Sequence, residues 1–307
     1  MGRIFVLGSL NADLVIEVAR PPLRGETLQG GELQAHPGGK GGNQAVAAAK
    51  LGGNVFMSGA VGSDVYGGFL LDSLTGAGAD VRHVHRAETS SGVAVINVFP
   101  DGDNSIVISP GANATVTSER ARAALADIGK GDFLLAQLEV PLKTVEAGFR
   151  HAYEAGATTV LDPAPAQHLP PALLESVSML TPNETEASTL LGQDSERDLE
   201  DTAKDLLALG PSTVVLKLGS EGARIATRDG ATARTAPFHV EAVDTTAAGD
   251  TFNAALAVAL TEGRDLLEAG RFACAAAALS VTRPGAQPSA PTREELQAFL
   301  SSRGVGT

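Results

Sequence analysis

Two kinds of segment alternate along most of this chain of 307 residues. Short runs rich in β-branched and other apolar residues are followed by longer runs in which alanine and leucine recur at helical spacing. Continuous apolar strands between helices are typical of a parallel sheet that is covered on both faces. The sequence therefore predicts an α/β fold with a Rossmann-like, mostly parallel central sheet and helices on both faces. The expected strands are 3–7, 54–60, 133–138, 158–162, 178–181 and 213–218, and the expected helices are 43–51, 118–128, 142–155, 184–191, 198–209, 249–262, 266–281 and 293–300.

Two segments, at about 13–34 and 92–109, break this alternation. Apolar and polar residues alternate within them, and turn signals interrupt them, such as Pro-Asp-Gly-Asp at 100–103. Alternation at a period of two is typical of strands with one covered and one wet face. We therefore expect antiparallel strands of a small lid beside the main sheet. Because the sequence has no linker and no repeat, residues 1–307 are predicted to form a single domain.

Composition narrows the possible partners. Lysine and arginine number 23 against 36 aspartates and glutamates, which gives a net charge of −13. A surface that acidic repels nucleic acid and anionic lipid, so neither is expected as a partner. No apolar run approaches the ~20 residues of a membrane span, and Arg3 precedes only a short apolar strand, so we expect a cytoplasmic protein. The single cysteine, Cys274, excludes an intramolecular disulfide and is expected to be a packed helical residue.

Polar side chains follow the expected strands at the points where those strands end. Ligands of open α/β sheets bind at the carboxyl ends of the strands, so these side chains are expected to converge on one site. They are Asn11, Asp13, Glu139, Asp162, Asn183, Glu186 and the segment 244–250, which follows a last strand-like run.

The segment 244–252 reads Asp-Thr-Thr-Ala-Ala-Gly-Asp-Thr-Phe and opens a long alanine-rich helix. The first N–H groups of a helix favour an anion, and small residues such as Gly249 let a ligand approach the backbone. Asp250 then lies in the first turn, beside an anion site, where a kinase needs a carboxylate to accept the proton of an alcohol. The alternative is that these residues only cap the helix. The convergence of the other polar residues favours the kinase.

Two further segments suit the two substrates of such an enzyme. Glycines surround Lys40 at 38–42 and precede Asn43, so this backbone could lie against a compact polyhydroxylated ligand; the alternative is a flexible hinge. Gly219 and Gly222 follow a valine-rich strand and suit a phosphate or a nucleobase; the alternative is an ordinary turn.

Two other segments suit metal ions. Asn183 and Glu186 are three residues apart at the start of a helix and share a face, where they could hold the waters of a Mg²⁺ ion. The alternative is a capping residue and its capping carboxylate. The segment 283–289, Arg-Pro-Gly-Ala-Gln-Pro-Ser, is rigid and rich in carbonyls, which suits a monovalent cation; the alternative is a surface turn.

Six segments together carry a resemblance to a known family. They are Asn-Ala-Asp at 11–13, Gly-Lys-Gly-Gly-Asn-Gln-Ala at 39–45, Gln-Leu-Glu at 137–139, Thr-Pro-Asn-Glu-Thr-Glu at 181–186, the segment 243–252, and Thr-Arg-Pro-Gly-Ala-Gln-Pro-Ser at 282–289. Over nearly its full length the chain resembles the ribokinase-like members of the PfkB carbohydrate kinases. The resemblance implies ATP-dependent phosphorylation of the 5-hydroxyl of D-ribose, giving ribose 5-phosphate and ADP, with Mg²⁺ accompanying ATP and K⁺ as an activator.

The resemblance also implies roles for individual residues. Asp250 would be the catalytic base, and Gly249 with its neighbouring N–H groups would form the anion hole. The sugar contacts would be Asn11, Asp13, Gly39, Lys40, Asn43 and Glu139, together with Asp250. The nucleotide side would comprise Asn183, Lys217, Leu218, Gly219, Ser220, Glu221, Gly222, Gly249 and the region of Cys274. A K⁺ site would use the side chains of Asp244 and Ser289 and the carbonyls of Thr246, Ser280, Arg283 and Gly285.

Three positions depart from the family's pattern. Thr246 stands where an aliphatic residue is common, Gly42 replaces a frequent alanine, and Lys217 stands where a small polar residue is expected. A kinase of another sugar or of a nucleoside, and a non-catalytic sugar or nucleotide sensor, remain alternatives.

The lid is also expected to be a dimer contact, because a few strands with one apolar face are marginal in water. The residues expected on that face are Ile16, Val18, Val95, Asn97 and Phe99.

Overall fold

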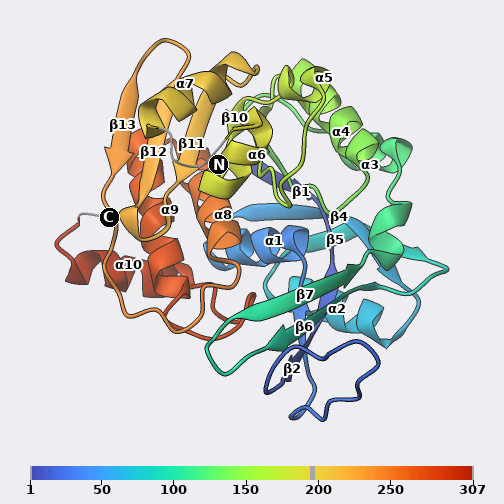
Figure 1. The fold of residues 1–307 in the computed structure, drawn as a ribbon. Coiled ribbons are helices and arrows are strands. Elements are labelled where there is room, and N and C mark those ends of the chain that lie inside the picture. Colours follow the sequence, from blue (N-terminus) through green and yellow to red (C-terminus); the bar gives the residue numbers. More distant parts are fainter. Residues whose placement is uncertain (1, 194–197, 306–307) are drawn as a thin grey trace.

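The computed structural model describes residues 2–193 and 198–305. Its main sheet contains β1 (Arg3–Leu7), β4 (Asn54–Gly62), β5 (Asp80–Ala87), β8 (Phe133–Ala136), β9 (Thr158–Leu161), β10 (Met179–Leu180), β11 (Thr213–Lys217), β12 (Ala223–Thr227) and β13 (Thr232–Thr235). The order across the sheet is β13-β12-β11-β10-β9-β8-β1-β4-β5 (Figure 1). The strands from β5 to β11 are parallel, whereas β12 and β13 add an antiparallel edge. The predicted fold class is therefore confirmed.

Helices cover both faces of this sheet. One layer holds α1 (Lys40–Lys50), α2 (Val65–Gly76), α8 (Ala248–Thr261), α9 (Leu266–Ser280) and α10 (Arg293–Ser302). The other holds α3 (Ser118–Ala124), α4 (Leu142–Glu154), α5 (Pro171–Leu174), α6 (Glu184–Leu191) and α7 (Leu199–Ala208). Successive residues of a strand point to opposite faces, so Ile4 and Val6 join the first core and Phe5 and Leu7 the second. In the described part of the chain, no helix is long and apolar enough to cross a membrane.

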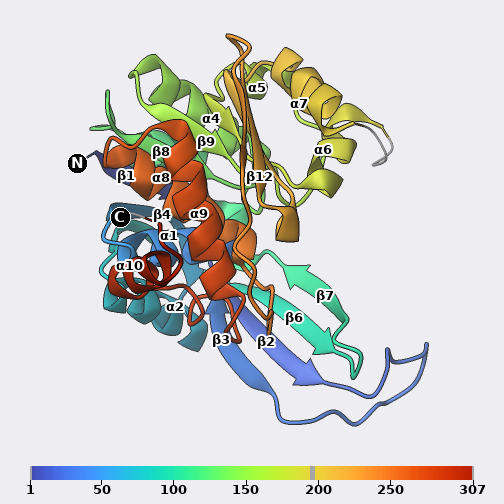
Figure 2. The same ribbon diagram turned by 90° about the vertical axis from the view of Figure 1, so that its left-hand side faces the viewer.

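A second, small sheet projects beside the main one (Figure 2). Its strands are β2 (Asn11–Glu17), β3 (Gln34–Gly38), β6 (Gly92–Val98) and β7 (Asn104–Ser109), in the order β3-β2-β6-β7. The expectation of an antiparallel lid is wrong at its centre, because β2 and β6 pair in parallel. The two strands reach the lid from separate parts of the main sheet and run outward from it side by side, whereas β3 and β7 return along their outer edges.

With one exception, each strand and helix expected from the sequence is present, with ends shifted by up to a few residues. The sequence analysis missed α2, α5, β5, β12 and β13. It also expected a strand just before Asp244, and this is wrong, because residues 236–247 lie past the edge strand β13 and form no strand. The N–H groups of Val243 and Asp244 donate instead to the carbonyl of Val281, at the end of α9.

The start of α1 packs directly on the turn that follows β1, and Gly41 makes that approach possible. A Cβ at Gly41 would lie 2.6 Å from the carbonyl carbon of Gly8 and 2.7 Å from the nitrogen of Ser9.

Gly41→Ala should therefore push α1 away from the sheet and lower the free energy of unfolding by about 1–3 kcal/mol. Gly68→Ala is the control, since nothing lies within 4 Å of a Cβ there. It should stabilise α2 by about 0.5–1 kcal/mol in the same urea titration. Equal effects of the two substitutions would contradict this account.

Candidate active site

The polar residues that follow the strands meet at one edge of the main sheet, as predicted. A pocket of about 440 Å³ lies there. Its walls come from the starts of α1, α6 and α8, the end of β9 and β11, and the turns beyond them. The lining residues are Lys40, Asp162, Ala164, Asn183, Glu184, Thr185, Glu186, Lys217, Gly219, Thr245, Ala247, Ala248, Gly249 and Asp250.

The start of α8 is shaped to receive a ligand. No side chain caps its N-terminus, and the residue before the helix, Ala247, has φ 57° and ψ 17°. Among the described residues, Ala247 is the only non-glycine residue with a positive φ. That left-handed conformation costs an L-residue roughly 1–2 kcal/mol. Strain of this kind gathers at functional sites, and here Ala247 and the first two residues of α8, Ala248 and Gly249, line the pocket.

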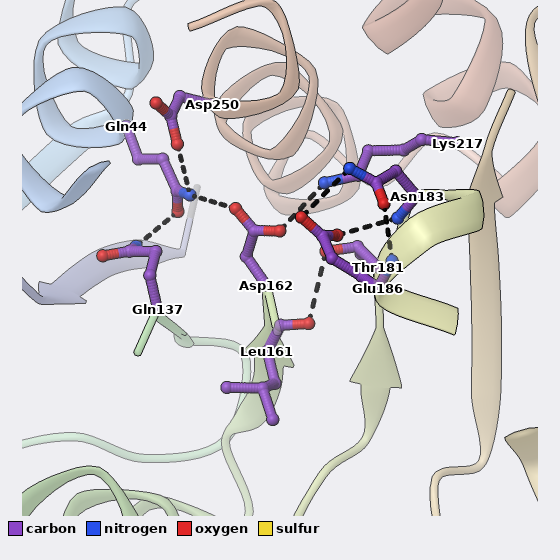
Figure 3. A network of polar contacts seen from close by, with 9 residues as sticks. All are labelled: Gln44, Gln137, Leu161, Asp162, Thr181, Asn183, Glu186, Lys217 and Asp250. Carbon is purple, nitrogen blue, oxygen red and sulfur yellow. Dashed lines mark hydrogen bonds and ion pairs between the residues drawn. The ribbon is translucent and has the colours of Figure 1, made fainter. Parts of the chain in front are cut away.

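Asp250 does not cap its own helix; its carboxylate contacts α1 instead (Figure 3). Oδ2 accepts a hydrogen bond of 2.9 Å from Asn43 Nδ2, and Oδ1 accepts one of 3.0 Å from Gln44 Nε2. Burial raises the pKa of Asp250 to about 6, and the charge of Asp162 adds to the shift, against the opposing effects of Lys40 and the two amides. A carboxylate with a pKa in this range is ionised at neutral pH and still basic enough to accept a proton.

Gln44 links Asp250 to a second carboxylate, Asp162, which the sequence analysis expected at this edge of the sheet without giving it a role. Its Nε2 also donates to Asp162 Oδ2 at 3.1 Å, and its Oε1 accepts from Gln137 Nε2 at 2.6 Å. Asp162 in turn pairs with Lys217, whose Nζ lies 2.9 Å from Oδ1 (Figure 3). The position of Asp162 at the end of a strand was the available signal for its role. Gln44 and Gln137 lie within two of the segments that carry the family resemblance, but the sequence analysis gave neither of them a role.

The residues expected to bind the sugar gather on the lid side of Asp250. Glu139 Oε2 accepts hydrogen bonds from Ser9 Oγ at 2.6 Å and from the backbone nitrogen of Lys40 at 3.3 Å. The amide of Asn11 lies 3.4 Å from the same oxygen. Gly39 has φ 80°, and a Cβ there would lie 2.7 Å from the nitrogen of Asn11, so only glycine fits at this point.

Two ionisable groups on this side have strongly shifted titrations. Burial raises the pKa of Asp13 to about 7, with further contributions from the charges of Glu139 and Asp250. Burial alone would lower the pKa of Lys40, but the surrounding carboxylates, Asp250 and Asp162 foremost, outweigh it and hold that pKa above its usual value. Lys40 is therefore a permanent cation between the two halves of the site.

The residues expected on the nucleotide side are only partly brought together. Asn183 and Gly219 line the pocket, while Ser220 and Glu221 complete a 3₁₀ turn at Gly219–Glu221. Glu221 forms an exposed ion pair with Arg234 at 2.9 Å. Leu218 is buried beneath this turn, and Gly222 closes it against the carbonyl of Thr235. Cys274 is buried on α9, with its Sγ 3.1 Å from Thr235 Oγ1, and does not line the pocket.

The candidate Mg²⁺ residues form the capping box that was the alternative interpretation. Asn183 Oδ1 accepts from the backbone nitrogen of Glu186, and Glu186 Oε2 accepts from that of Asn183, both at 2.8 Å. Glu186 nevertheless lines the pocket, and burial raises its pKa. Within residues 2–193 and 198–305, no group of three or more His, Cys, Asp or Glu side chains could hold a metal ion. Donors this sparse fit an ion held mainly by water and phosphate.

Two of the candidate K⁺ residues, Thr246 and Gly285, contact the carboxylate of Asp244. It accepts hydrogen bonds from the backbone nitrogens of Thr246 at 2.9 Å and Gly285 at 2.7 Å. Burial tends to raise the pKa of Asp244, but these bonds outweigh it and lower that pKa. The carboxylate therefore ties the segment 283–289 to the approach of α8. Ser289 and Ser280 are buried nearby in the chain segments that flank this tie, and the Arg283 side chain pairs with Glu295 at 2.9 Å.

Known proteins match this chain along nearly its whole length. The model of the pfkB family of carbohydrate kinases matches residues 1–293. The ribokinase of Bacillus subtilis (strain 168) is 44% identical over 303 residues, which are 98% of this chain and 100% of that protein. The deoxyribokinase of Salmonella typhi is 36% identical over 302 residues, 97% of this chain and 98% of that one. A structure of Arabidopsis thaliana ribokinase complexed with ribose and ATP has a TM-score of 0.89 at 35% identity, covering 98% of this chain and 99% of that chain. The chain belongs to the pfkB family of carbohydrate kinases, so the recognition from its motifs is confirmed.

The link through Gln44 generates a prediction about pH. Kinase activity should fall as the pH drops through about 6, where Asp250 takes up a proton. Gln44→Ala removes a hydrogen bond to the charged form of Asp250, so its pKa should rise and the acid limb of kcat should move to higher pH by about one unit. Gln287→Ala is the control: this amide is also buried, but it contacts Ser73 and Gly38. Superimposable acid limbs in Gln44→Ala and the wild type would contradict the assignment.

Proposed function

We propose that this protein transfers the terminal phosphoryl group of ATP to the 5-hydroxyl of D-ribose, giving ribose 5-phosphate and ADP. The observation that carries the proposal is the buried carboxylate of Asp250 in the first turn of an uncapped helix, inside the pocket where sugar-side and nucleotide-side residues meet. The ribokinase relative and the ribokinase structure complexed with ribose and ATP support it. The use of ATP favours a cytoplasmic location, which cell fractionation would test.

The roles of the residues follow from their positions. Asp250 accepts the proton of the 5-hydroxyl while its oxygen attacks the terminal phosphorus, and ADP leaves on the opposite side. The N–H groups at Gly249 and the ammonium of Lys40 stabilise the charge that spreads over the phosphoryl oxygens. Asn183 and the turn at 218–222 border the nucleotide. Little covalent help is needed, so the work of the site is positioning and charge stabilisation.

The sugar is held by paired hydrogen bonds. Asp13 and Asn43 take ribose hydroxyls, Asn11 and Glu139 take others, and the backbone from Gly39 lies against the ring. The acceptor oxygen of Asn43 is buried and lacks a hydrogen-bond partner in the described structure, which suits an incoming hydroxyl. A deoxyribokinase among the relatives makes 2-deoxyribose the nearest competing substrate. A site built around hydroxyl pairs should discriminate against a sugar that lacks one.

A substrate panel tests the proposed function and Asp250 together. The wild-type protein with ATP should release ADP fastest with ribose, among ribose, 2-deoxyribose, other pentoses and nucleosides. Asp250→Asn should lower kcat by ~10²–10⁴-fold and leave ribose and ATP binding largely intact, because only the base is lost. A faster turnover of 2-deoxyribose or a nucleoside would move the assignment to that substrate. Binding without ADP release from any of them would make the protein a sensor.

Two metal ions complete the proposal. Mg²⁺ would enter with ATP and neutralise phosphate charge, with Glu186 and Asn183 holding its waters. K⁺ would bind between Asp244 and the segment 283–289, using Ser289 and the carbonyls of Thr246, Ser280, Arg283 and Gly285. The tie between Asp244 and Gly285 supports such a site, because an ion there would fix the loop that leads into α8.

Activity should therefore rise when K⁺ replaces a bulky organic cation at constant ionic strength. The effect should appear in kcat as well as in KM, since the loop leads into the anion hole. Initial rates in potassium chloride and tetramethylammonium chloride would measure it. Identical rates in the two salts would reject a functional cation site.

We also propose that the lid forms a homodimer contact. The edge strand β7 exposes Ile106, Val107 and Ile108 on both of its faces. Val107 is the registered neighbour of Val95, which is 40% exposed on the adjacent strand. Ile16 and Asn97 are likewise neighbours across β2 and β6. Two lids packed around a two-fold axis would cover the face that carries Ile16, Val95 and Val107 in both subunits.

Charges on that face should separate the subunits. The combined substitutions Ile16→Asp and Val95→Asp should weaken the dimer and raise the ribose KM, because the same sheet carries Asp13. Leu267→Asp adds a charge at an exposed apolar residue on α9 and should change neither quantity. Light scattering at micromolar concentration measures the mass, and a monomeric wild-type protein would contradict this proposal.

A further inference from the structure

Lys217 stands at the point where the two halves of the site meet. It ends β11, and its ammonium forms an ion pair of 2.9 Å with Asp162, with side-chain exposures of 12% for Lys217 and 4% for Asp162. The same ammonium lies beside the start of α8, where a Cβ on Gly249 would be 3.4 Å from Nζ. Because glycine has no side chain, nothing from that residue separates the cation from the first turn of the helix. Lys217 therefore borders both Asp162 and the proposed anion hole.

The charges around the pocket favour a second partner for the ammonium group of Lys217. The carboxylates of Asp162, Glu186 and Asp250 face the ammonium groups of Lys40 and Lys217 across one pocket. A nucleoside triphosphate adds several negative charges to this already acidic set, so its terminal phosphoryl group competes with Asp162 for Lys217. Asp162 would keep a donor if Lys217 left, since Gln44 Nε2 lies 3.1 Å from its other oxygen.

The flexibility of the lysine makes such an exchange geometrically simple. Its four-carbon stem carries a point charge with rotatable donors, and only its tip has to move. An ion pair that served stability alone would gain nothing from facing the pocket. Two neutral side chains packed at these positions would also avoid the cost of removing two charges from water.

We propose that Lys217 is a catalytic residue that passes from Asp162 to the transferring phosphoryl group and stabilises its charge, opposite Lys40. The proposal rests on the proposed function for the identity of the nucleotide's phosphoryl group as the ligand. It assigns a role to the one residue of the nucleotide strand that departs from the family's pattern. The ion pair with Asp162 is then the resting position of the cation in the absence of nucleotide.

The test compares Lys217→Met with the wild type in two measurements. Steady-state kinetics with ATP and ribose should show kcat lowered by about 100-fold, as for the loss of one preorganised donor to a transition-state charge. Calorimetric titrations should show weaker binding of ATP and unchanged binding of AMP, which lacks the phosphates that Lys217 would reach. An unchanged kcat, or an equal weakening of ATP and AMP binding, would overturn the proposal.

A second pair of variants separates the effect of losing the Lys217 charge from the effect of leaving the carboxylate of Asp162 unpaired. Lys217→Met alone leaves a buried carboxylate unpaired, which costs stability whatever the role of the lysine. Asp162→Asn is therefore compared with Asp162→Asn combined with Lys217→Met, where no unpaired charge remains. The combined variant should again lose about 100-fold in kcat relative to Asp162→Asn. If the two had equal kcat, Lys217 would only neutralise Asp162, and the proposal would fall.

The two measurements also separate this proposal from the proposed function. A wild-type protein that released no ADP with any sugar would refute the proposed function through the kinetic arm. The ATP and AMP titrations would still decide whether Lys217 contacts the terminal phosphates.

Discussion

The amide of Gln44 lies between two carboxylates, and the arrangement of the site depends on it. Asp250 and Asp162 come from different elements, α8 and the end of β9, and their like charges would drive them apart in a buried pocket. A single Nε2 group donates to both, and Gln137 fixes the orientation of the amide by donating to its oxygen. The bridge sets how far α8, which carries Asp250, can stand from the end of β9, which Asp162 follows. Small changes in α1 are thereby transmitted to both carboxylates.

The position of α1 depends in turn on close packing between backbone segments. The helix begins at Lys40, against the turn after β1, with contacts so short that Gly41 has no room for a side chain. The N–H of Gly42 donates to the carbonyl of Ser9 at 2.9 Å and joins the two segments. This contact brings Asn43 and Gln44 within reach of Asp250. The glycine-rich segment therefore has a purpose beyond the proposed contact with a sugar: it seats the two amides that hold Asp250.

The sequence predicted most of the elements and the strand-end positions, because these depend on local pattern and on a general property of parallel sheets. It placed Asp250 in the first turn of a helix, and the structure confirms that position. It did not predict the contacts of Gln44, Asp162 and Lys217, because they join residues far apart in the chain and depend on side-chain orientation. The antiparallel lid was wrong for a related reason. Alternating apolar and polar residues show that a strand has two different faces, but both parallel and antiparallel neighbours satisfy that pattern. Likewise, α2 begins at Val65 and has adjacent glycines at 67 and 68. They weaken the helical pattern in the sequence, and tertiary packing stabilises the helix in spite of them.

The acidity of Asp13 gives the proposed sugar side a second property. With a pKa of about 7, this group is divided near neutrality between carboxylate and carboxylic acid. The charged form accepts hydrogen bonds only, whereas the neutral form can donate one, so a pair of sugar hydroxyls interacts differently with each. Any ligand that prefers one form must shift the balance and exchange a fraction of a proton with the solvent on binding. If Asp13 contacts the sugar as proposed, capture of an uncharged sugar is a proton-linked event, with a heat that depends on the buffer, before any phosphate has moved.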